Sequence, residues 1–536
     1  MRTIRFIVTI LLACGIAGGL MAAPGDTLKS FATPGHCPQG LTFDGKYLWS
    51  SDRKTDMIYK INPDDGAPVD SLPAPAYMPL SLTWDGRLLW CVDAGEEFIW
   101  GINPETGIAE RTIWCPVSRP GGLAFDGENL WIADDGENKL HSISTDDGTT
   151  MTTIPAPTSH PGALTFDGTY LWVADRFKDM IYMVTPNSGD VIICFKAAGP
   201  YTSGLAHDGK NLWSVDYQTD LIYRHVVDDG SLFARLDEKY QHLEFTHQAR
   251  NYGPGEVKSL DVYLAVPVDR NSQELTAPIV YDPQPDDFLT DRWGQKVAHW
   301  RFADLAATEF TNITMLTTAR LYQNRYFVFP DKVGSFEDIP KDLGKMYLID
   351  DSKFALNDPI IQNGVKEAVG DETNPYWVGR KIYNYVIDKI EYERVGGWNI
   401  APTVLDRGNG SCSEYSFVYI AMCRAAGLPA RYVGAVTVRG DDASWDNVFH
   451  RWVEIYLPGY GWIPVDPSGG DSEWPADRAN SFGYLNNRFL ITTGGGGGSE
   501  YLEWSYNANE RWTSKGRCKI VVEYFGEWSP VVEDNE

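Results

Sequence analysis

The chain has 536 residues, of which 73 are acidic and 46 are basic, and its formal net charge is −27 at pH 7. Apolar residues make up 43% of the sequence and aromatic residues 13%, which excludes a disordered or collagen-like chain. The acidic excess argues against a nucleic-acid-binding protein and against a large footprint on anionic membranes, because both need clustered Lys and Arg.

The first residues have the pattern of a secretory signal peptide. A short basic start precedes the apolar run Phe6–Leu12, and small residues follow up to Ala23. We therefore expect residues 1–23 to be a signal peptide and the protein to be secreted, periplasmic or at the cell surface. The alternative is lipoprotein anchoring at Cys14, because the residues before it resemble a lipobox. No other apolar run approaches the roughly 20 residues of a membrane helix, so we expect no transmembrane span.

The remaining cysteines do not form a recognisable disulfide pattern. Their number is odd and their spacing irregular, so at least one thiol is expected to be free. They are Cys37, Cys91, Cys115, Cys194, Cys412, Cys423 and Cys518.

A segment built around Asp-Gly and Leu-Trp recurs five times within residues 24–236, with a fixed period of 41 residues. A period of this length indicates a repeat architecture. Short β-rich runs separated by Asp-Gly turns, with no helical stretch, fit the four-stranded blades of a β-propeller. Three series of residues keep the period: Asp44, Asp85, Asp126, Asp167 and Asp208; Trp49, Trp90, Trp131, Trp172 and Trp213; and Asp52, Asp93, Asp134, Asp175 and Asp216.

The repeats resemble those of six- and seven-bladed NHL and quinoprotein-like propellers, although five copies are visible. Both Thr27–Ala32 and Ser231–Leu236 match the last strand of a blade. A five-bladed ring with an extra strand and an irregular sixth blade therefore both remain open. We expect the tryptophans to pack between blades and the first Asp series to form turns. The second Asp series is expected to bond neighbouring backbone, with Ca²⁺ binding as the alternative, and the propeller to bind a protein or polysaccharide partner.

Residues 237–345 lose the period and alternate apolar and polar residues, as half-buried strands do. Pro- and Asp-rich turns separate these runs. The segment predicts an Ig-like β-sandwich that acts as a linker or recognition domain.

The composition changes again in residues 346–536, where helical periodicity appears over Pro359–Val369 and Pro375–Ile390. The Gly-rich loop Gly408–Ser411 then leads into a helix that begins at Cys412. A thiol at a helix N-terminus lies among unpaired N–H groups and at the positive end of the helix dipole. Both favour the nucleophilic thiolate.

A base for this thiol is expected at His450, in a strand followed by a turn at Pro458-Gly459. The return strand ends at Asp466. If the hairpin centres on the turn, His450 faces Asp466 to within about one residue, and the carboxylate can fix the imidazole tautomer. Cys412, His450 and Asp466 are thus candidates for a thiol triad.

Four ordered motifs resemble the transglutaminase-like core over roughly residues 340–500. They are Gly410–Ser416, Cys423–Arg431, His450–Glu454 and Gly461–Pro467. The resemblance implies an α+β papain-like domain at 346–536 with Cys412 as nucleophile, His450 as base and Asp466 as orienting residue. It also implies acyl transfer from an amide through a thioester. We expect no metal and no organic cofactor.

The bacterial branch of this family is expected to hydrolyse, so the sequence predicts a protease or amidase acting on a protein or peptide substrate. A cross-linking transglutaminase and a catalytically silent extracellular binding module are the alternatives. Trp398 and Tyr415 are candidates for binding substrate, and Glu414 and Glu454 for orienting neighbouring groups.

Two further segments carry expectations. The turn Asp291–Gln295 is similar to an Asp-x-x-Gly-Asn turn in domains that precede bacterial transglutaminase-like cores, with Gln in place of Asn. The run Gly494–Gly498 predicts a mobile loop near the cleft or a plain surface loop, because ordering five glycines costs much backbone entropy.

Overall fold

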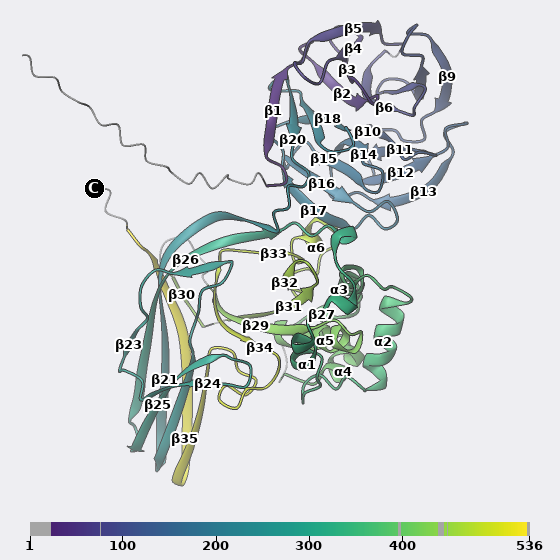
Figure 1. Cartoon of the computed structure of the whole chain (residues 1–536). Coiled ribbons are helices and arrows are strands. Elements are labelled where there is room, and N and C mark those ends of the chain that lie inside the picture. Colours follow the sequence, from purple (N-terminus) through teal and green to yellow (C-terminus); the bar gives the residue numbers. More distant parts are fainter. Residues whose placement is uncertain (1–22, 76, 395–397, 438–443, 448, 533–536) are drawn as a thin grey trace, which may run out of the picture.

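The computed structural model describes residues 23–75, 77–394, 398–437, 444–447 and 449–532. The predicted signal peptide, except Ala23, and the lipobox Cys14 lie outside the described residues. Within the described part, no helix is long and apolar enough to cross a membrane. Figure 1 shows a propeller at one end, a sheet of long strands at the other, and a helix-containing region that lies beside the sheet and below the propeller.

The N-terminal part is a β-propeller of five four-stranded antiparallel blades. Four blades use consecutive strands, whereas β1 completes the fifth by pairing with β20, so that Phe31 lies opposite Ile222. The ring is therefore closed by the first strand, and Ser231–Leu236 adds no blade because β21 begins at Phe233 and pairs with β26. The blade strands are β1 (Thr27–Ala32), β2 (Pro38–Phe43), β3 (Leu48–Asp52), β4 (Met57–Ile61), β5 (Pro68–Pro73), β6 (Pro79–Trp84), β7 (Leu89–Asp93), β8 (Phe98–Ile102), β9 (Ala109–Trp114), β10 (Pro120–Phe125), β11 (Leu130–Asp134), β12 (Lys139–Ile143), β13 (Thr150–Pro155), β14 (Pro161–Phe166), β15 (Leu171–Asp175), β16 (Met180–Val184), β17 (Val191–Lys196), β18 (Thr202–His207), β19 (Leu212–Asp216) and β20 (Leu221–His225).

The repeated residues hold each blade together as expected. Asp44 Oδ1 accepts hydrogen bonds from the turn N–H groups, and its Oδ2 accepts one from Trp49 Nε1 at 2.8 Å. The same indole–carboxylate bond recurs in the other four blades. Each buried Trp packs against the next blade, as Trp49 does against Leu82. In the second series, Asp52 Oδ2 accepts from Cys37 N at 2.7 Å, which confirms a bond to backbone.

After the propeller, β21 (Phe233–Ala265) is the central strand of a nine-stranded sheet. It runs antiparallel to β26 (Phe310–Tyr326) and then β25 (Lys296–Leu305) on one side, and to β35 (Ala508–Pro530) on the other. Five short strands join the edges: β22 (Gln273–Leu275), β23 (Val280–Asp282), β24 (Asp287–Thr290), β30 (Ser444–Asp446) and β33 (Tyr484–Leu485).

This arrangement refines the predicted sandwich. Its strands hydrogen-bond as one sheet, and that sheet recruits strands from beyond residue 345, the expected end of the domain. Alternation along the sequence predicts that a segment is a strand, but it does not identify the strand's partner. Phe245, for example, pairs with Gly526, which is far away in the sequence.

The helix-containing region has an α+β arrangement. A four-stranded sheet in the order β32-β31-β29-β34 packs against α5, the helix that begins at Cys412. The predicted helix Pro359–Val369 is observed with Asp358 as its N-cap. The elements are η1 (Pro330–Lys332), η2 (Phe336–Asp338), α1 (Lys341–Tyr347), α2 (Pro359–Val369), α3 (Pro375–Lys389), β27 (Glu391–Tyr392), α4 (Ala401–Arg407), β28 (Asn409–Gly410), α5 (Cys412–Ala425), β29 (Ala430–Thr437), β31 (His450–Leu457), β32 (Gly461–Val465), α6 (Pro475–Ala479) and β34 (Phe489–Gly495).

The propeller and this region share a packed interface at α3 and α6. Asp190 at the end of the fourth blade accepts a hydrogen bond from Asn384 at 3.1 Å and lies 3.6 Å from the guanidinium of the buried Arg380. Ala476 N donates to Pro157 O at 3.2 Å. The propeller is therefore anchored on the α+β region.

Candidate active site

Cys412 is the first residue of α5, and a buried carboxylate fixes the loop before it. Glu414 is fully buried, and its Oε2 accepts hydrogen bonds from Ser411 N at 3.2 Å and from Arg407 at 2.7 Å. Its Oε1 accepts from Asn399 N at 2.9 Å. Glu414 thus orients its neighbours, as expected, and leaves the N-terminal N–H groups of α5 beside the thiol.

His450 and Asp466 come from the neighbouring strands β31 and β32. His450 Nε2 lies 2.6 Å from Asp466 Oδ2. The register pairs Val453 with Val465, so the position opposite His450 is 468 and Asp466 lies two positions before it. The expected offset was about one position, and the difference arises because the turn closes between Leu457 and Gly461. Diagonal neighbours at this offset are still within reach of side chains.

The charges of the three groups depend on one another. Burial opposes ionisation of Cys412, but the hydrogen bond and the positive charge of His450, with the Arg451 N–H, hold the pKa of the thiol below its usual value. Burial also disfavours the imidazolium, yet the charge and hydrogen bond of Asp466, followed by Cys412, raise the pKa of His450 well above its usual value. The pKa of Asp466 is lowered: the charge of His450 outweighs the effect of burial. The favoured state is a thiolate–imidazolium pair.

These three residues line one open pocket of about 600 Å³. Aromatic and basic side chains form much of its wall, so the pocket suits an extended substrate with polar groups. The other lining residues are Tyr392, Arg394, Trp398, Ser411, Ser413, Thr437, Phe449, Ser468, Gly469, Arg488, Phe489 and Tyr506.

The two predicted substrate-binding aromatics differ in position. Trp398 lines the pocket and has a positive φ of 50°, a strained conformation for a bulky residue. Tyr415 does not line it: the side chain is fully buried in α5 and its hydroxyl donates to Ile390 O. The prediction for Tyr415 is therefore wrong: although it lies about one helical turn after Cys412, its ring packs into the hydrophobic core and not into the pocket.

Arg451 is a residue that the sequence analysis missed. It follows His450 on β31 and is fully buried, with its guanidinium carbon 4.4 Å from the ring centre of Tyr506 and 5.0 Å from that of Trp398. Rings of Phe417 and Tyr432 complete the surroundings. This aromatic cage compensates a buried cation by cation–π contacts next to the nucleophile. Its position inside the His450–Glu454 motif was the available signal.

Glu454 lies on the same strand and anchors the far side of the region. Its carboxylate accepts from Arg431 Nε at 2.7 Å and lies 3.5 Å from Arg270 of the long sheet. Burial would raise its pKa, but these two guanidinium charges hold the pKa of Glu454 below its usual value. Glu454 has an orienting role, as predicted.

The glycine run is neither a mobile loop nor a surface loop. Its first two residues end β34, and Gly495, Gly496 and Gly497 are buried. A Cβ atom on Gly496 would lie 2.5 Å from the ring of Trp293, so the absence of side chains permits close packing against the turn Asp291–Gln295. The prediction was wrong because a run of glycines also suits a site where backbone and aromatic rings meet.

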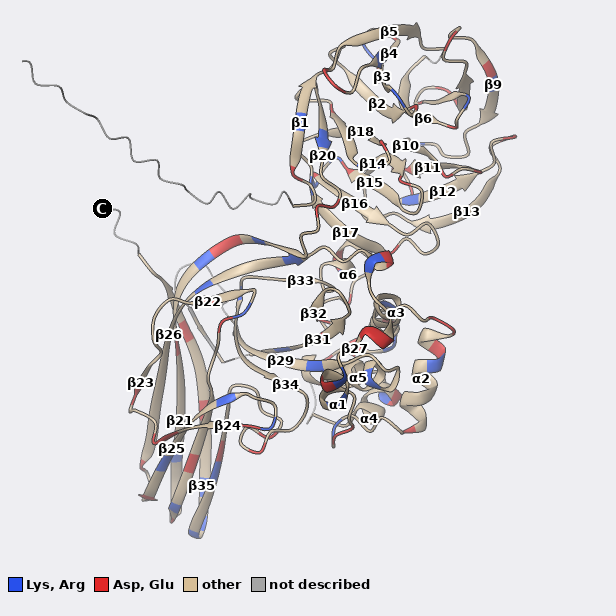
Figure 2. Ribbon diagram, viewed as in Figure 1, with Lys and Arg blue, Asp and Glu red and all other residues tan. Residues whose placement is uncertain are grey.

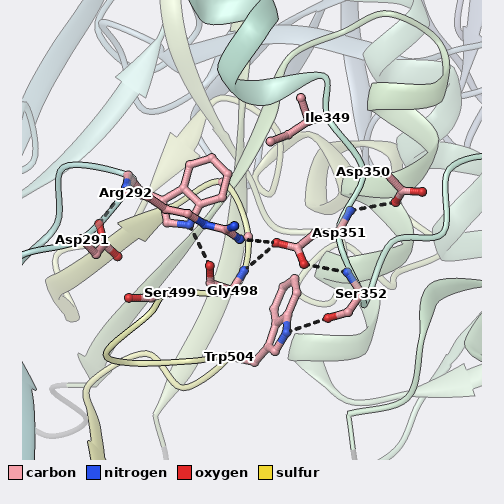
Figure 3. Close-up of polar contacts among 12 residues, drawn as sticks. Asp291, Arg292, Ile349, Asp350, Asp351, Ser352, Gly498, Ser499 and Trp504 are labelled. Atoms are coloured by element: carbon pink, nitrogen blue, oxygen red, sulfur yellow. Dashed lines mark hydrogen bonds and ion pairs between the residues drawn. The ribbon is translucent and has the colours of Figure 1, made fainter.

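Asp351 joins the turn to the glycine run, as Figure 3 shows. Its Oδ2 accepts hydrogen bonds from Arg292 at 2.6 Å and from Gly498 N at 3.0 Å. Trp293 Nε1 donates to Gly498 O at 3.1 Å. The long sheet is thereby fastened to the α+β region that carries Cys412.

A helix-borne thiol facing a His–Asp pair on an adjacent sheet defines a papain-like arrangement. Residues 363–467 match the family model of the transglutaminase-like superfamily, and this part of the chain is a transglutaminase-like domain.

Three partial similarities extend the comparison. An uncharacterized protein of Haemophilus influenzae is 30% identical over 156 residues, covering 24% of this chain and 42% of its own length. A candidate cysteine protease from Cytophaga hutchinsonii is 14% identical, with 57% of this chain and 95% of that chain covered and a TM-score of 0.38. The virginiamycin B lyase of Staphylococcus aureus is 22% identical, with 37% and 69% covered and a TM-score of 0.26. The chain thus spans less than half of the length of its Haemophilus relative.

Proposed function

We propose that the protein is a cysteine hydrolase that cleaves peptide or isopeptide bonds, with Cys412 as nucleophile, His450 as general acid and base, and Asp466 as the residue that orients His450. One observation carries the proposal: Cys412, His450 and Asp466 line the same open pocket, and His450 Nε2 lies 2.6 Å from Asp466 Oδ2. Protein or peptide chains are the substrate class, and no metal or cofactor takes part in the proposed steps.

In the first half of the proposed reaction, the Cys412 thiolate adds to the carbonyl carbon of the amide. Backbone N–H groups at the start of α5 face the oxygen that becomes negative, with the Cys412 N–H as the first donor. When the C–N bond breaks, His450 donates its proton to the leaving amine. A thioester and a neutral imidazole result.

In the second half, water attacks the thioester. The neutral His450 removes a proton from the water, and the C–S bond breaks to release a carboxylic acid and the thiolate. A lysine amine in place of water would give a cross-linked product by the same steps. The acceptor distinguishes a hydrolase from a transglutaminase, and the family resemblance favours water.

The test uses wild-type protein, Cys412→Ala and the control Cys518→Ser, a half-buried cysteine on β35 that is remote from the pocket lining. Each is incubated with a mixed protein substrate and a tagged primary amine, followed by mass spectrometry. New peptide ends that need Cys412 support the protease. Tagged glutamines would show that the protein is a transglutaminase and not a protease. Conversion of glutamine to glutamate without tagging would show that it is a deamidase. Equal products from wild-type and Cys412→Ala would contradict the proposed nucleophile, and no products from either would favour a binding module.

We also propose that the protein is exported, on the basis of the basic start and the apolar run Phe6–Leu12. The N-terminal sequence of the mature protein tests this proposal. A start at Pro24 would agree with cleavage after Ala23, whereas a lipid on Cys14 would establish the lipoprotein alternative.

A further inference from the structure

One end of the propeller carries a set of variable residues on an otherwise constant repeat. The residue after each Asp of the second series is different in most blades, although the Asp itself never changes. These five residues are Arg53, Ala94, Asp135, Arg176 and Tyr217. Constant positions maintain the fold, so the variable ones at a shared location are free to form a binding site.

These side chains surround one cup at the mouth of the propeller, with a volume of about 660 Å³. In four blades the variable residue donates its N–H to the residue that precedes the innermost strand, as Arg53 does to Cys37 O at 3.1 Å and Tyr217 to Tyr201 O at 3.0 Å. Each of these four blades therefore presents a pair of side chains at the same end.

The innermost strands close the floor of the cup. A Cβ atom on Gly40 would lie 2.7 Å from Leu82 N, and one on Gly204 would lie 2.6 Å from Leu41 N. Backbone packs against backbone there, so no peptide strand fits between the inner strands. A ligand in the cup must be recognised by side chains at the mouth.

Figure 2 shows acidic residues in all parts of the chain, whose net charge is −27, but the side chains that line the cup are four basic groups and one carboxylate. The Asp residues of the second series lie behind this lining, buried and bonded to backbone N–H groups. Asp135 is its one lining carboxylate, and it pairs with the guanidinium groups of Arg119 and Arg176, the second at 3.2 Å, while His160 Nδ1 lies 3.1 Å from it. Arg53 and Lys54 are exposed, and neither forms an ion pair with any residue in the described ranges. The Arg53 guanidinium has one weak hydrogen bond, to Met78 Sδ at 3.9 Å, and keeps its other N–H groups toward the cup. Exposed Arg and Lys side chains without a carboxylate partner suit the binding of an anion.

Aromatic rings complete the cup. Tyr201 and Tyr217 lie with ring centres 5.4 Å apart, and Tyr217 is 41% exposed. The Arg176 guanidinium carbon is 5.9 Å from the Tyr201 ring. The exposed ring of Tyr217, beside the half-buried Tyr201 and near cations, suits a ligand that has both apolar ring faces and negative groups.

We propose that the mouth of the propeller binds an acidic oligosaccharide, a sugar chain that carries carboxylate or sulfate groups. Arg53 and Lys54 pair with these groups, and Tyr217 stacks on a sugar ring. An acidic peptide is less favoured because the closed inner strands offer no edge for backbone pairing. This site is separate from the Cys412 pocket and goes beyond the proposed hydrolysis.

The test measures binding of full-length protein to oligogalacturonate, to heparin oligosaccharide, to neutral dextran oligosaccharide and to poly-glutamate by calorimetry. Arg53→Ala/Lys54→Ala is compared with Lys46→Ala/Lys210→Ala, which removes two exposed charges from the opposite ends of the inner strands. We expect saturable binding to one acidic glycan or both, about tenfold weaker or more in the first variant and nearly unchanged in the second.

The assignment is supported if the affinity decreases with rising salt concentration and is also lower in Tyr217→Ala. Comparison of the two acidic glycans distinguishes a carboxylate ligand from a sulfate ligand. Absence of saturable binding to both acidic glycans would overturn it, as would equal affinity of the two double variants. Tighter binding of poly-glutamate than of either acidic glycan would show that the ligand is an acidic peptide and not a glycan. The reactivity of Cys412 is measured separately by alkylation. A negative result in the binding experiment therefore does not contradict the proposed hydrolase.

Discussion

His450 Nε2 and Asp466 Oδ2 lie 2.6 Å apart although Asp466 stands beside Trp452, not opposite His450, in the register of β31 and β32. Asp466 is the first residue after β32, where the strand ends and its side chain can lean diagonally. Its other oxygen accepts from Ser468 Oγ at 2.8 Å and from Gly469 N at 3.1 Å. The carboxylate is thus fixed from one side and available to the imidazole from the other.

Asp466→Asn should reduce kcat/KM by about 100-fold or more, on the order of a general acid–base contribution. Without the carboxylate charge, the raised pKa of His450 moves down, so the alkaline limb of the pH profile shifts to lower pH. The weaker imidazolium raises the pKa of Cys412, so the acid limb shifts to higher pH. A pH profile of kcat/KM measures both limbs. Asp388→Asn, an exposed carboxylate paired with Arg478, is the matched control. A wild-type profile in Asp466→Asn would remove Asp466 from the triad.

Iodoacetamide should alkylate Cys412 before any of the other described cysteines at about pH 6.5, because the lowered pKa of Cys412 gives it a larger thiolate fraction. Burial raises the pKa of Cys91 to about 12 and raises that of Cys423 as well, so these thiols stay protonated. His450→Ala should slow labelling of Cys412 by about tenfold or more, since it removes the imidazolium. Peptide mass spectrometry over time gives each rate. Equal labelling of Cys412 in wild-type and His450→Ala would show that the pair does not activate the thiol.

Much of this architecture could be predicted from local patterns. The spacing of Asp44 and Trp49 and their repeats predicts blades, because each pair forms its hydrogen bond within five residues. The number of blades could not be predicted, because it depends on the pairing of β1 with β20. No local sequence pattern contains information on this distant contact. In the same way, β35 pairs with β21 across 244 to 289 residues, from Leu264↔Ala508 to Gln241↔Pro530.

The candidate site shows the same division. Motifs predicted Cys412, His450 and Asp466, since each motif fixes one residue type beside a turn or helix start. Tyr506 lines the pocket and contacts Arg451, but it comes from a segment without any motif. Tyr415 shows the opposite case: it belongs to a motif, but its side chain is buried in the core. Motif membership alone does not say whether a side chain faces the substrate.

Glu454→Gln should destabilise the protein by about 3 kcal/mol at pH 7, because it leaves Arg431 and Arg270 without a buried counter-charge. The pKa of Glu454 is lowered in the folded state, so its contribution is present above the unfolded pKa of about 4.3. It is lost as pH falls through the folded pKa, and the two proteins should then converge. Urea unfolding at several pH values tests this, with the exposed Glu137→Gln as a control that should change little. A difference that persists at low pH would contradict the ionic role.

Gly496→Ala should destabilise the protein by about 1–3 kcal/mol, the usual cost of overpacking, because the new methyl group meets the Trp293 ring. Trp293 also holds Gly498 through its indole N–H, so displacing the ring loosens the attachment between the long sheet and the α+β region. Thermal unfolding followed by tryptophan fluorescence measures the effect. Gly344→Ala is the control: it lies in α1, where its added Cβ would approach only Leu348 Cδ1, at 3.6 Å, and alanine favours a helix. If Gly496→Ala were as stable as Gly344→Ala, the glycine run would not depend on close packing against Trp293.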